Sequence, residues 1–406
     1  MLSAEQKRAV DIFDKNSLLL APAGTGKTFT LAHKVAEAIK RGIKPEEILL
    51  LTFTVKARDE IKEDVFTYAG ERAVNAYTVH GFCFDIIKNY SYNKRVAGGL
   101  TVADETDTGE LIKSLADAMI AEKTELADKL TILPEKQISR IVSLIKYERD
   151  KLGFPYSSKE GYGAAIASLI NSGEYIDAFS FRKSGAQITD YNFYNLLKTR
   201  GNEFCLRYAD LLSSSSLLDF DDILLYSKEI VFGGDYPVDG YKLVVLDEVQ
   251  DTSLLEYSIV EKFFSSATVM LCGDENQTIY GWRGSDPKKI ISAYKEKYSP
   301  EEIRLTINRR ATETLKRAAE GYLAKVNCEE LPAYNDEPDG EKIAVYGCES
   351  DVGEAKKIFS LIENFDGENT DVCVMTRSNR YLATLYKNLQ RINNSLPKER
   401  RIPFFT

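Results

Sequence analysis

The sequence predicts an α/β protein whose main unit is a parallel β-sheet, followed by a partial second α/β unit. Three observations predict this class. First, short apolar runs typical of strands occur at Leu18–Leu20, Ile48–Thr52 and Val74–Thr78, and segments with helical spacing separate them. Second, strands that alternate with helices favour parallel pairing. Third, the pattern is mostly helical between residues 89 and 207 and strand-type runs resume beyond it, which indicates a helical insertion.

The chain begins with a short helix expected over residues 2–13. Ser3 is placed to cap this helix, and Gln6 follows three residues later, which is the spacing of a capping box. A glutamine amide also offers one donor and one acceptor, the pair that an adenine edge requires. The spacing fits both interpretations of Gln6.

The next element, Leu18–Thr28, has the sequence LLLAPAGTGKT and combines a strand, a glycine-rich turn and the start of a helix. This context is typical of a phosphate-binding loop. Gly24 and Gly26 let the backbone close around an anion, and the N–H groups of the helix start point at it. Lys27 supplies a positive charge for the outer phosphates, and the Thr28 hydroxyl is a ligand for Mg²⁺. The plainer alternative is a chance turn.

The strands at 48–52 and 74–78 each end in candidates for ligand contact. Phe53 and Thr54 follow the first of these strands, and His80 follows the second. In parallel sheets, ligands bind beyond the carboxyl ends of the strands. An aromatic side chain at a strand end is more often part of the core, so each residue is a weak signal alone.

Two charged clusters have both a plain and a functional interpretation. Basic residues in the segment 138–152 form either a solvated face or a phosphate-contacting one. They are Arg140, Lys146, Arg149 and Lys151. Asp219, Asp221 and Asp222 lie close together, as in a metal site, but an acidic helix start favoured by the helix dipole is the simpler interpretation.

The sheet resumes at Leu243–Leu246, an apolar run that ends in Asp247 and Glu248. A buried strand that delivers two carboxylates is the second signature of nucleotide hydrolysis. Asp247 is the expected Mg²⁺ ligand, and Glu248 is expected to orient and deprotonate water. A chance Asp-Glu pair is common, but the preceding phosphate-binding loop gives this pair weight.

A further strand at Thr268–Cys272 leads into a polar and aromatic loop. Gln277 in this loop is a candidate for sensing the γ-phosphate or its water. Tyr280, Trp282 and Arg283 offer base stacking, a cation–π contact and a phosphate partner. A single tryptophan usually belongs to a core, yet this one follows a nucleotide signature.

A second α/β unit is expected past Ser299. Strands are expected at Ile303–Ile307, Ile343–Tyr346 and Val372–Thr376, each followed by a helix, and the proline-containing stretch Leu331–Gly340 connects them. No phosphate-binding loop occurs in this part of the sequence.

Composition bounds the class of protein. The 406 residues are 44% hydrophobic and 28% charged, which suits two or three soluble domains. We expect no membrane association, because no run approaches the length of a membrane span and no signal peptide is visible. Six scattered cysteines and two histidines argue against a zinc site and favour reduced thiols in a cytoplasm. The net charge of −9 excludes a protein coated in positive charge but leaves room for a local nucleic-acid groove.

Nine segments of the chain carry motifs that stand in a fixed order. They are LSAEQ, APAGTGKT, LLLTFTVKARDEI, TVHGF, LLDFDDIL, VVLDEVQDTS, CGDENQTIYGWRGSD, LTINRRA and VCVMTRSN. In these segments the chain resembles the UvrD/Rep-type superfamily 1 DNA helicases. The resemblance implies an ATP- and Mg²⁺-dependent motor on single-stranded or partly duplex DNA. It assigns residues 1–88 and 208–298 to a first RecA-like (P-loop NTPase) domain, 89–207 to a helical inserted subdomain and 299–406 to part of a second RecA-like domain.

The same resemblance implies roles for individual residues. Catalytic roles fall on Lys27, Asp247, Glu248, Gln277 and Arg310, and Mg²⁺ ligation falls on Thr28 and Asp247. ATP contacts are implied for Gln6, Ala23, Gly24, Thr25, Gly26, Lys27, Thr28, Arg309 and Arg310. Contacts with single-stranded DNA are implied for Phe53, Thr54, His80, Phe220, Tyr280, Trp282 and Arg283.

The chain also departs from the family pattern. Phe29 stands where the family usually has arginine, and Arg309 stands where a tyrosine usually packs on the adenine. The segments V-x-x-x-T-x-H-x-x-K-G-L-E and V-A-x-T-R-A, which contain the last motor motifs, do not occur. We therefore expect a truncated second domain, weak ATP hydrolysis by the chain alone, and dependence on a missing motor half or a nuclease or repair partner.

Two other functions stay open at this point. One is a nucleotide-gated subunit that binds DNA or protein without motor activity. The paired Asp247 and Glu248 argue against it, because a pure binder needs no catalytic base. The other is the motor subunit of a helicase–nuclease complex, although the sequence contains no recognisable nuclease carboxylate cluster.

Overall fold

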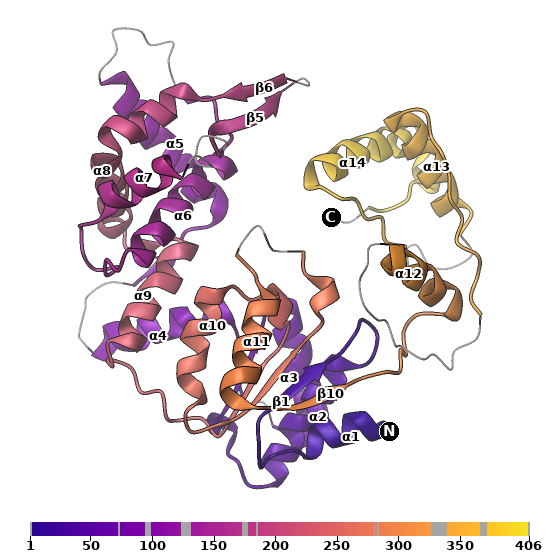
Figure 1. Ribbon diagram of the computed structural model, residues 1–406. Coiled ribbons are helices and arrows are strands. Elements are labelled where there is room, and N and C mark those ends of the chain that lie inside the picture. The colour runs from indigo at the N-terminus through magenta and orange to yellow at the C-terminus, as the bar shows by residue number, and fades with distance from the viewer. Residues whose placement is uncertain are drawn as a thin grey trace. The chain divides into compact units, whose positions relative to one another are not determined.

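The computed structural model contains two compact units, Met1–Pro338 and Asp339–Thr406, each of which is described by itself (Figure 1). The residues described are 2–71, 74–93, 99–122, 131–172, 178–183, 186–279, 281, 284–325, 339–365 and 372–404. Among these, no helix is long and apolar enough to cross a membrane.

The first unit is built on a six-stranded sheet in which every pairing is parallel. Its strand order is β10-β1-β9-β8-β2-β3. The strands are β1 (Ser17–Leu20), β2 (Ile48–Thr52), β3 (Asn75–Thr78), β8 (Leu243–Leu246), β9 (Thr268–Gly273) and β10 (Glu301–Arg304). The predicted parallel α/β class is therefore confirmed.

The strand expected at Ile303–Ile307 was assigned to the wrong sheet. It forms two residues earlier than expected, as β10. It pairs with β1, and Ile303 lies opposite Leu19. An apolar strand shows where it starts and ends but not which neighbour it pairs with, because its partner here is almost 300 residues away in the sequence.

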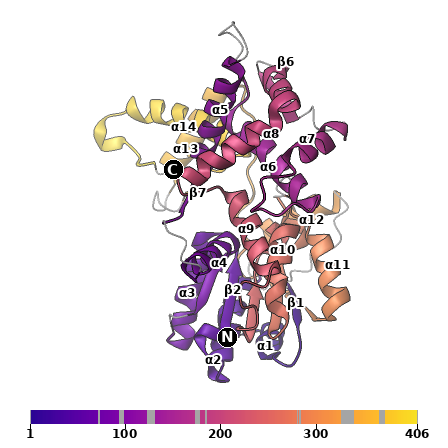
Figure 2. The same cartoon turned by 90° about the vertical axis from the view of Figure 1, so that its left-hand side faces the viewer.

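Helices cover both faces of this sheet because its strands are apolar on both sides. Leu49 and Leu51 pack into the core on one face, whereas Ile48 and Leu50 pack into the core on the other, as the two-residue period of a strand requires. One face carries α1 (Ala4–Asp11), α2 (Lys27–Lys40) and α3 (Val55–Ala69). The opposite face carries α4 (Val79–Asn93), α9 (Phe220–Phe232), α10 (Leu254–Glu261) and α11 (Pro287–Tyr298). Figure 2 shows α2 and α11 on opposite sides of the sheet.

The stretch between β3 and β8 contains a separate helical core, as its sequence pattern predicts. Its helices are α5 (Glu105–Ala121), α6 (Glu135–Lys151), α7 (Tyr162–Asn171) and α8 (Tyr191–Ser214). Its short strands are β4 (Thr101–Val102), paired with β7 (Leu217–Leu218), and β5 (Ser180–Lys183), paired with β6 (Ala186–Thr189). We refer to α5–α8 with β5 and β6 as the helical insertion.

Short 3₁₀ turns and one further helix complete the described part of the first unit. They are η1 (Pro45–Glu47), η3 (Val249–Asp251), η4 (Lys262–Phe264), η5 (Glu275–Gln277) and α12 (Glu313–Lys325). Two of these turns, η3 and η5, follow β8 and β9 directly and therefore lie at the carboxyl edge of the sheet. Residues 331–338 of the proline-containing stretch lie outside the described residues.

The second unit is a helix pair, α13 (Asp351–Glu363) and α14 (Asn379–Asn394), followed by η8 (Lys398–Arg400). Phe359 and Leu389 belong to its core. The strands expected at Ile343–Tyr346 and Val372–Thr376 do not form. Strands need neighbours for their backbone hydrogen bonds, and none is present among the described residues, so that Val345 is 90% exposed.

Candidate nucleotide-binding site

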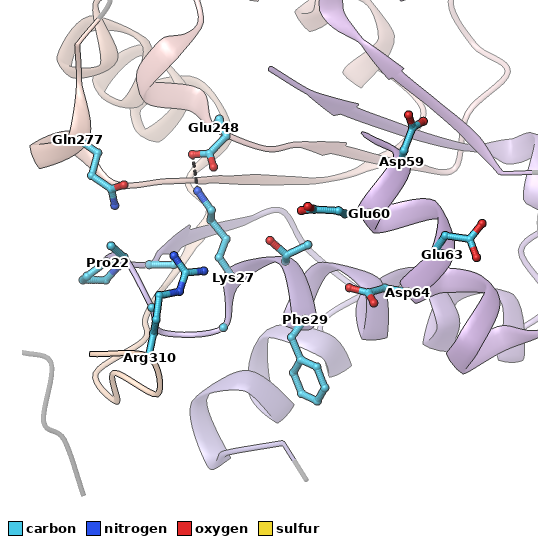
Figure 3. Close-up of a pocket in the computed structure, with 15 residues that line it drawn as sticks. Pro22, Lys27, Phe29, Asp59, Glu60, Glu63, Asp64, Glu248, Gln277 and Arg310 are labelled. Carbon is cyan, nitrogen blue, oxygen red and sulfur yellow. Dashed lines mark hydrogen bonds and ion pairs between the residues drawn. The ribbon is translucent and has the colours of Figure 1, made fainter. Parts of the chain in front are cut away.

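A cavity of about 800 Å³ lies at the carboxyl edge of the sheet and brings together loops from four strands. The phosphate-binding loop follows β1, Glu248 follows β8, Gln277 follows β9 and Arg310 follows β10. Figure 3 shows these side chains around one space, with acidic residues of α3 on its far side. Those acidic residues, which sequence analysis missed, are Asp59, Glu60, Glu63 and Asp64. The edge is the position at which parallel sheets bind ligands.

The loop from Ala21 to Gly26 needs glycine at two positions. Gly24 and Gly26 have φ values of 78° and 82°, in the region that side-chain-bearing residues rarely adopt. A Cβ on Gly24 would lie 2.7 Å from Oδ1 of Asn308, and a Cβ on Gly26 would lie 2.8 Å from Nε2 of Gln6. Helix α2 begins immediately afterwards at Lys27. Its first N–H groups therefore face the cavity, as in an anion-binding helix start.

Lys27 is the positively charged residue that contacts both carboxylates at the end of β8. Its Nζ forms an ion pair with Glu248 and lies 3.6 Å from Oδ1 of Asp247. Burial by itself lowers the pKa of Lys27, but attraction from Asp247 and Glu248 outweighs this effect and raises that pKa above its usual range. The ammonium group therefore stays charged and available for an incoming phosphate.

Two buried or half-buried carboxylates, Asp247 and Asp251, lie beyond the end of β8. Asp247 is 3% exposed, and burial raises its pKa to about 6. Asp251 nearby also has its pKa raised to about 6, first by burial and then by repulsion from Glu248. Oδ1 of Asp251 is buried and, within the described part of the chain, has no hydrogen-bond partner. Clustered carboxylates of this kind are relieved by a bound cation.

Few protein ligands would hold such a cation. Over the described ranges, no group of three or more His, Cys, Asp or Glu side chains is placed to bind a metal ion. Mg²⁺ usually binds through one or two carboxylates together with substrate phosphates and waters. Asp247 and the hydroxyl of Thr28 fit that pattern, and their assignment as Mg²⁺ ligands stays a prediction.

Gln6 forms the predicted capping box and also contacts the phosphate-binding loop. Its Oε1 accepts a hydrogen bond from the backbone of Ser3 at 2.9 Å, and the Ser3 hydroxyl accepts one from the backbone of Gln6. Its Nε2 donates to the carbonyl of Thr25 at 3.2 Å. The capping interpretation is confirmed, and adenine recognition stays a prediction for a side chain already next to the loop.

The loop after β10 is tied to the phosphate-binding loop. The backbone N–H of Arg309 donates to the carbonyl of Gly24 at 2.7 Å, and Nδ2 of Asn308 donates to the carbonyl of Ala23 at 2.9 Å. Figure 3 shows the side chain of Arg310 extending beside Lys27. Asn308 is a positioning residue that sequence analysis did not single out, although it stands in the quoted motif LTINRRA.

Phe29 also lines the cavity and belongs to an aromatic cluster. Its ring centroid lies 4.2 Å from that of His33 and 5.7 Å from that of Tyr68, with an edge-on arrangement in the second pair. The residue that departs from the family pattern is therefore packed against neighbouring side chains of α2 and α3.

Of the predicted DNA contacts, His80 and Phe220 lie together. Their ring centroids are 5.4 Å apart in an edge-on arrangement, and Phe220 is 39% exposed. The Nδ1 of His80 lies 3.3 Å from Oε1 of Glu256. Thr54 caps α3 by accepting from the backbone of Ala57 at 3.1 Å. Phe53 is half-buried beside it.

Three further predicted DNA contacts, Tyr280, Trp282 and Arg283, lie outside the described residues. The roles of all these residues in binding DNA stay predictions.

The acidic run before α9 is a helix start, as predicted, and its partner is Lys146. Asp219 caps α9 by accepting from the backbone of Asp222 at 2.9 Å. Lys146 is 6% exposed and Arg149 3% exposed, so the expectation of a solvated basic face is wrong for both. Arg149 donates to backbone carbonyls of the loop after α6, including Pro155. A basic side chain on the apolar face of a helix is buried where it finds such partners.

The fold and the cavity define a nucleotide-binding protein of the phosphate-loop class with a carboxylate pair opposite the loop. Comparison with protein families is more specific. The family model described as the UvrD/REP helicase N-terminal domain matches residues 2–299, and the UvrD-like helicase C-terminal domain matches residues 303–406. The chain belongs to the UvrD/REP helicase family, which confirms the resemblance noted in its sequence.

Curated proteins with similar sequences are DNA helicases. The chain is 26% identical to the ATP-dependent DNA helicase PcrA of Staphylococcus aureus, over 97% of this chain and 50% of that protein. It is 28% identical to DNA helicase II of Rickettsia typhi, over 89% of this chain and 50% of that protein. The chain spans about half the length of the curated relatives it matches. The expected truncation of the second domain is not confirmed, because a C-terminal domain match extends to residue 406.

Proposed function

We propose that this chain provides the ATP-hydrolysing and DNA-contacting part of an ATP-dependent DNA helicase that translocates on single-stranded DNA. The observation that carries this proposal is the convergence of Lys27, Glu248, Gln277 and Arg310 on one cavity beyond the carboxyl ends of four strands. Membership of the UvrD/REP helicase family supports it.

In this proposal, each side chain has a separate role in the transfer of the γ-phosphoryl group to water. The backbone of the loop and Lys27 hold the phosphates, and Arg310 stabilises charge that develops on the transferred group. Glu248 orients the attacking water and accepts its proton. Asp247 and the Thr28 hydroxyl would hold Mg²⁺ together with the phosphates, and the ion would supply positive charge to offset that of the phosphates. Gln277 reports the state of the γ-phosphate to the loop that leads to Tyr280 and Trp282.

We also propose how the chain is divided. Residues 1–88 and 208–298 form the first RecA-like domain, to which β10 adds an edge strand through its pairing with β1. Residues 89–207 belong to a helical subdomain with its own apolar core, and this subdomain continues to the end of α8 at Ser214, because Tyr208 and Leu212 belong to the same core. The remainder of 299–406 belongs to a second RecA-like domain, for which the match to the C-terminal family model is the support.

The direct test replaces Lys27 by alanine. We expect this variant to lose both affinity for a fluorescent ATP analogue and DNA-stimulated phosphate release, because the loop loses its only side-chain cation. Lys40→Ala, at the other end of α2, is the matched control and is expected to behave as wild type. Equal hydrolysis by wild type and Lys27→Ala would refute the proposal. The same assay measures whether the chain alone is as slow as expected.

A further inference from the structure

A buried side chain, Gln250, connects two segments of the nucleotide site. It lies in η3, directly after β8, and is 2% exposed. It does not line the cavity, whereas Glu248 and Gln277 do. Any influence of Gln250 on the site is therefore exerted through the residues that it contacts.

Both ends of the Gln250 amide are engaged. Its Nε2 donates to Oε2 of Glu248. Its Oε1 accepts from the backbone N–H of Asp274 at 3.0 Å. A carboxylate only accepts and an ammonium only donates, so an amide is the side chain that serves both partners at once.

The contacts continue on either side of this bridge. Oε2 of Glu248 also accepts from Nζ of Lys27, in the phosphate-binding loop. Oδ2 of Asp274 accepts from Nε2 of Gln277 at 2.7 Å. Hydrogen bonds thus run without a break from Lys27 to Gln277, and Gln250 is the link between the loops after β8 and β9.

Packing holds this bridge in place. Strands β8 and β9 are paired neighbours, with Leu246 opposite Leu271, so the two loops leave the sheet side by side. At the end of β9, a Cβ on Gly273 would overlap Oε1 of Gln250 and lie 2.7 Å from Val249. The amide is therefore packed directly against bare backbone, a fit that leaves little freedom for its rotation.

We propose that Gln250 is a positioning residue for ATP hydrolysis, which holds the carboxylate of Glu248 in place and joins it to the loop that contains Gln277. This inference rests on the proposed function. Among the residues that the structure describes, both hydrogen bonds to the Glu248 carboxylate reach Oε2, and Oε1 is left for the attacking water. A phosphate that attracts Lys27 removes one of these hydrogen bonds, and Gln250 retains the other.

Two variants separate the two ends of the amide. Gln250→Glu keeps an acceptor for the N–H of Asp274 but loses the donor to Glu248. Gln250→Leu loses both. In single-turnover assays we expect both to hydrolyse ATP more slowly by about 10- to 100-fold, the effect typical of removing an outer hydrogen-bond partner. Affinity for a fluorescent ATP analogue stays unchanged, because Gln250 does not line the cavity.

Hydrogen exchange tests the contact between Oε1 of Gln250 and the N–H of Asp274, and this measurement does not require catalysis. The amide of Asp274 is expected to exchange faster in Gln250→Leu than in wild type, and at the wild-type rate in Gln250→Glu. Gln137→Glu is the matched control. Gln137 donates to the carbonyls of Ala178 and Ser180 at 2.6 and 2.8 Å in the helical insertion, and its replacement should alter neither readout.

The outcomes are distinct. Wild-type hydrolysis by Gln250→Glu, or equal exchange at Asp274 in Gln250→Leu and wild type, would overturn the assignment. If Gln250→Leu does not fold, Gln250→Glu carries the kinetic test alone. If wild type neither binds nor hydrolyses ATP, the proposed function fails, while the exchange comparison still decides whether the bridge exists.

Discussion

The ammonium group of Lys146, on the helical insertion, lies 2.6 Å from the carboxylate of Asp219, which caps the helix that begins with Phe220. The same ammonium group lies 2.5 Å from Asp222. Two more side chains of α6 donate to Asp221, at 2.5 and 2.6 Å. The residues on both sides of the candidate DNA-stacking residue Phe220 are thus fixed by one face of one helix.

Replacement of Lys146 tests how much this contact stabilises the protein. Lys146→Met leaves buried carboxylates without their cation, and breaking a buried pair in this way typically costs about 3 to 5 kcal/mol of unfolding free energy. Urea unfolding measures the loss. Lys151→Met, on the same helix but with an exposed side chain, is the control and should change stability little. Equal stability of the two variants would show that the pair is not important.

The acidity of Asp222 makes stability depend on pH in a defined direction. Burial, followed by repulsion from Asp219, raises the pKa of Asp222 from 3.8 to about 7. Between these values the unfolded chain has lost its proton while the folded protein retains it, so this group's contribution to stability falls as pH rises. Asp222→Asn mimics the protonated form. Its unfolding free energy relative to wild type should therefore increase from about pH 5 to about pH 8 in urea titrations; a constant difference would contradict this.

The parallel sheet and the nucleotide site were predictable because their signals are local. A glycine turn between an apolar strand and a helix identifies the loop at Gly24–Lys27, and Asp247 follows an apolar strand directly. Parallel strands then bring such ends to one edge whatever their separation in sequence. This is why Lys27 and Glu248 could be assigned to one site before the structure was known.

The predictions that were wrong or missing concern residues whose partners lie far away in the sequence. The basic face at Lys146 is buried because carboxylates more than 70 residues away neutralise it, and no local pattern contains that information. The strand expected at 303–307 forms as β10 (Glu301–Arg304) and pairs in the first sheet with β1, which is even more distant in the sequence. Gln250 was visible in VVLDEVQDTS, but its bridging role depends on the backbone of Asp274 in another loop.

Phe220 offers a direct test of the proposed DNA path. The ring of Phe220 is 39% exposed beside His80, and stacking of a base on such a ring contributes about 1 to 3 kcal/mol. Phe220→Ala should weaken binding of a fluorescent oligothymidine by the corresponding factor. Phe232→Ala removes another exposed ring at the far end of α9 and should bind normally. Equal binding by the two variants would remove Phe220 from the path.

The adjacent residues Arg309 and Arg310 should have separable effects. Arg310 lines the cavity, so Arg310→Ala is expected to lower the rate of hydrolysis, by up to about 10³- to 10⁵-fold for a true arginine finger. Arg309→Ala keeps the backbone hydrogen bond to Gly24 but loses the guanidinium plane, so nucleotide affinity should fall and the maximal rate should not. Steady-state kinetics measure both. If Arg309→Ala lowered the rate and Arg310→Ala lowered only the affinity, the two roles would have to be exchanged: Arg309 would be the arginine finger and Arg310 the nucleotide contact.

Glu248→Gln distinguishes a motor from a nucleotide-gated binding subunit. The substitution retains the shape of the side chain and its acceptor oxygen but removes the base, so hydrolysis should fall by about 10²- to 10⁴-fold. Nucleotide affinity should persist or increase, because the ion pair that competes for Lys27 is lost. DNA binding should still respond to the nucleotide, whereas ATP-driven movement along a labelled strand should stop. If strand movement or the cellular role of the protein survives this change, hydrolysis is not what drives it and the binding-subunit hypothesis is favoured.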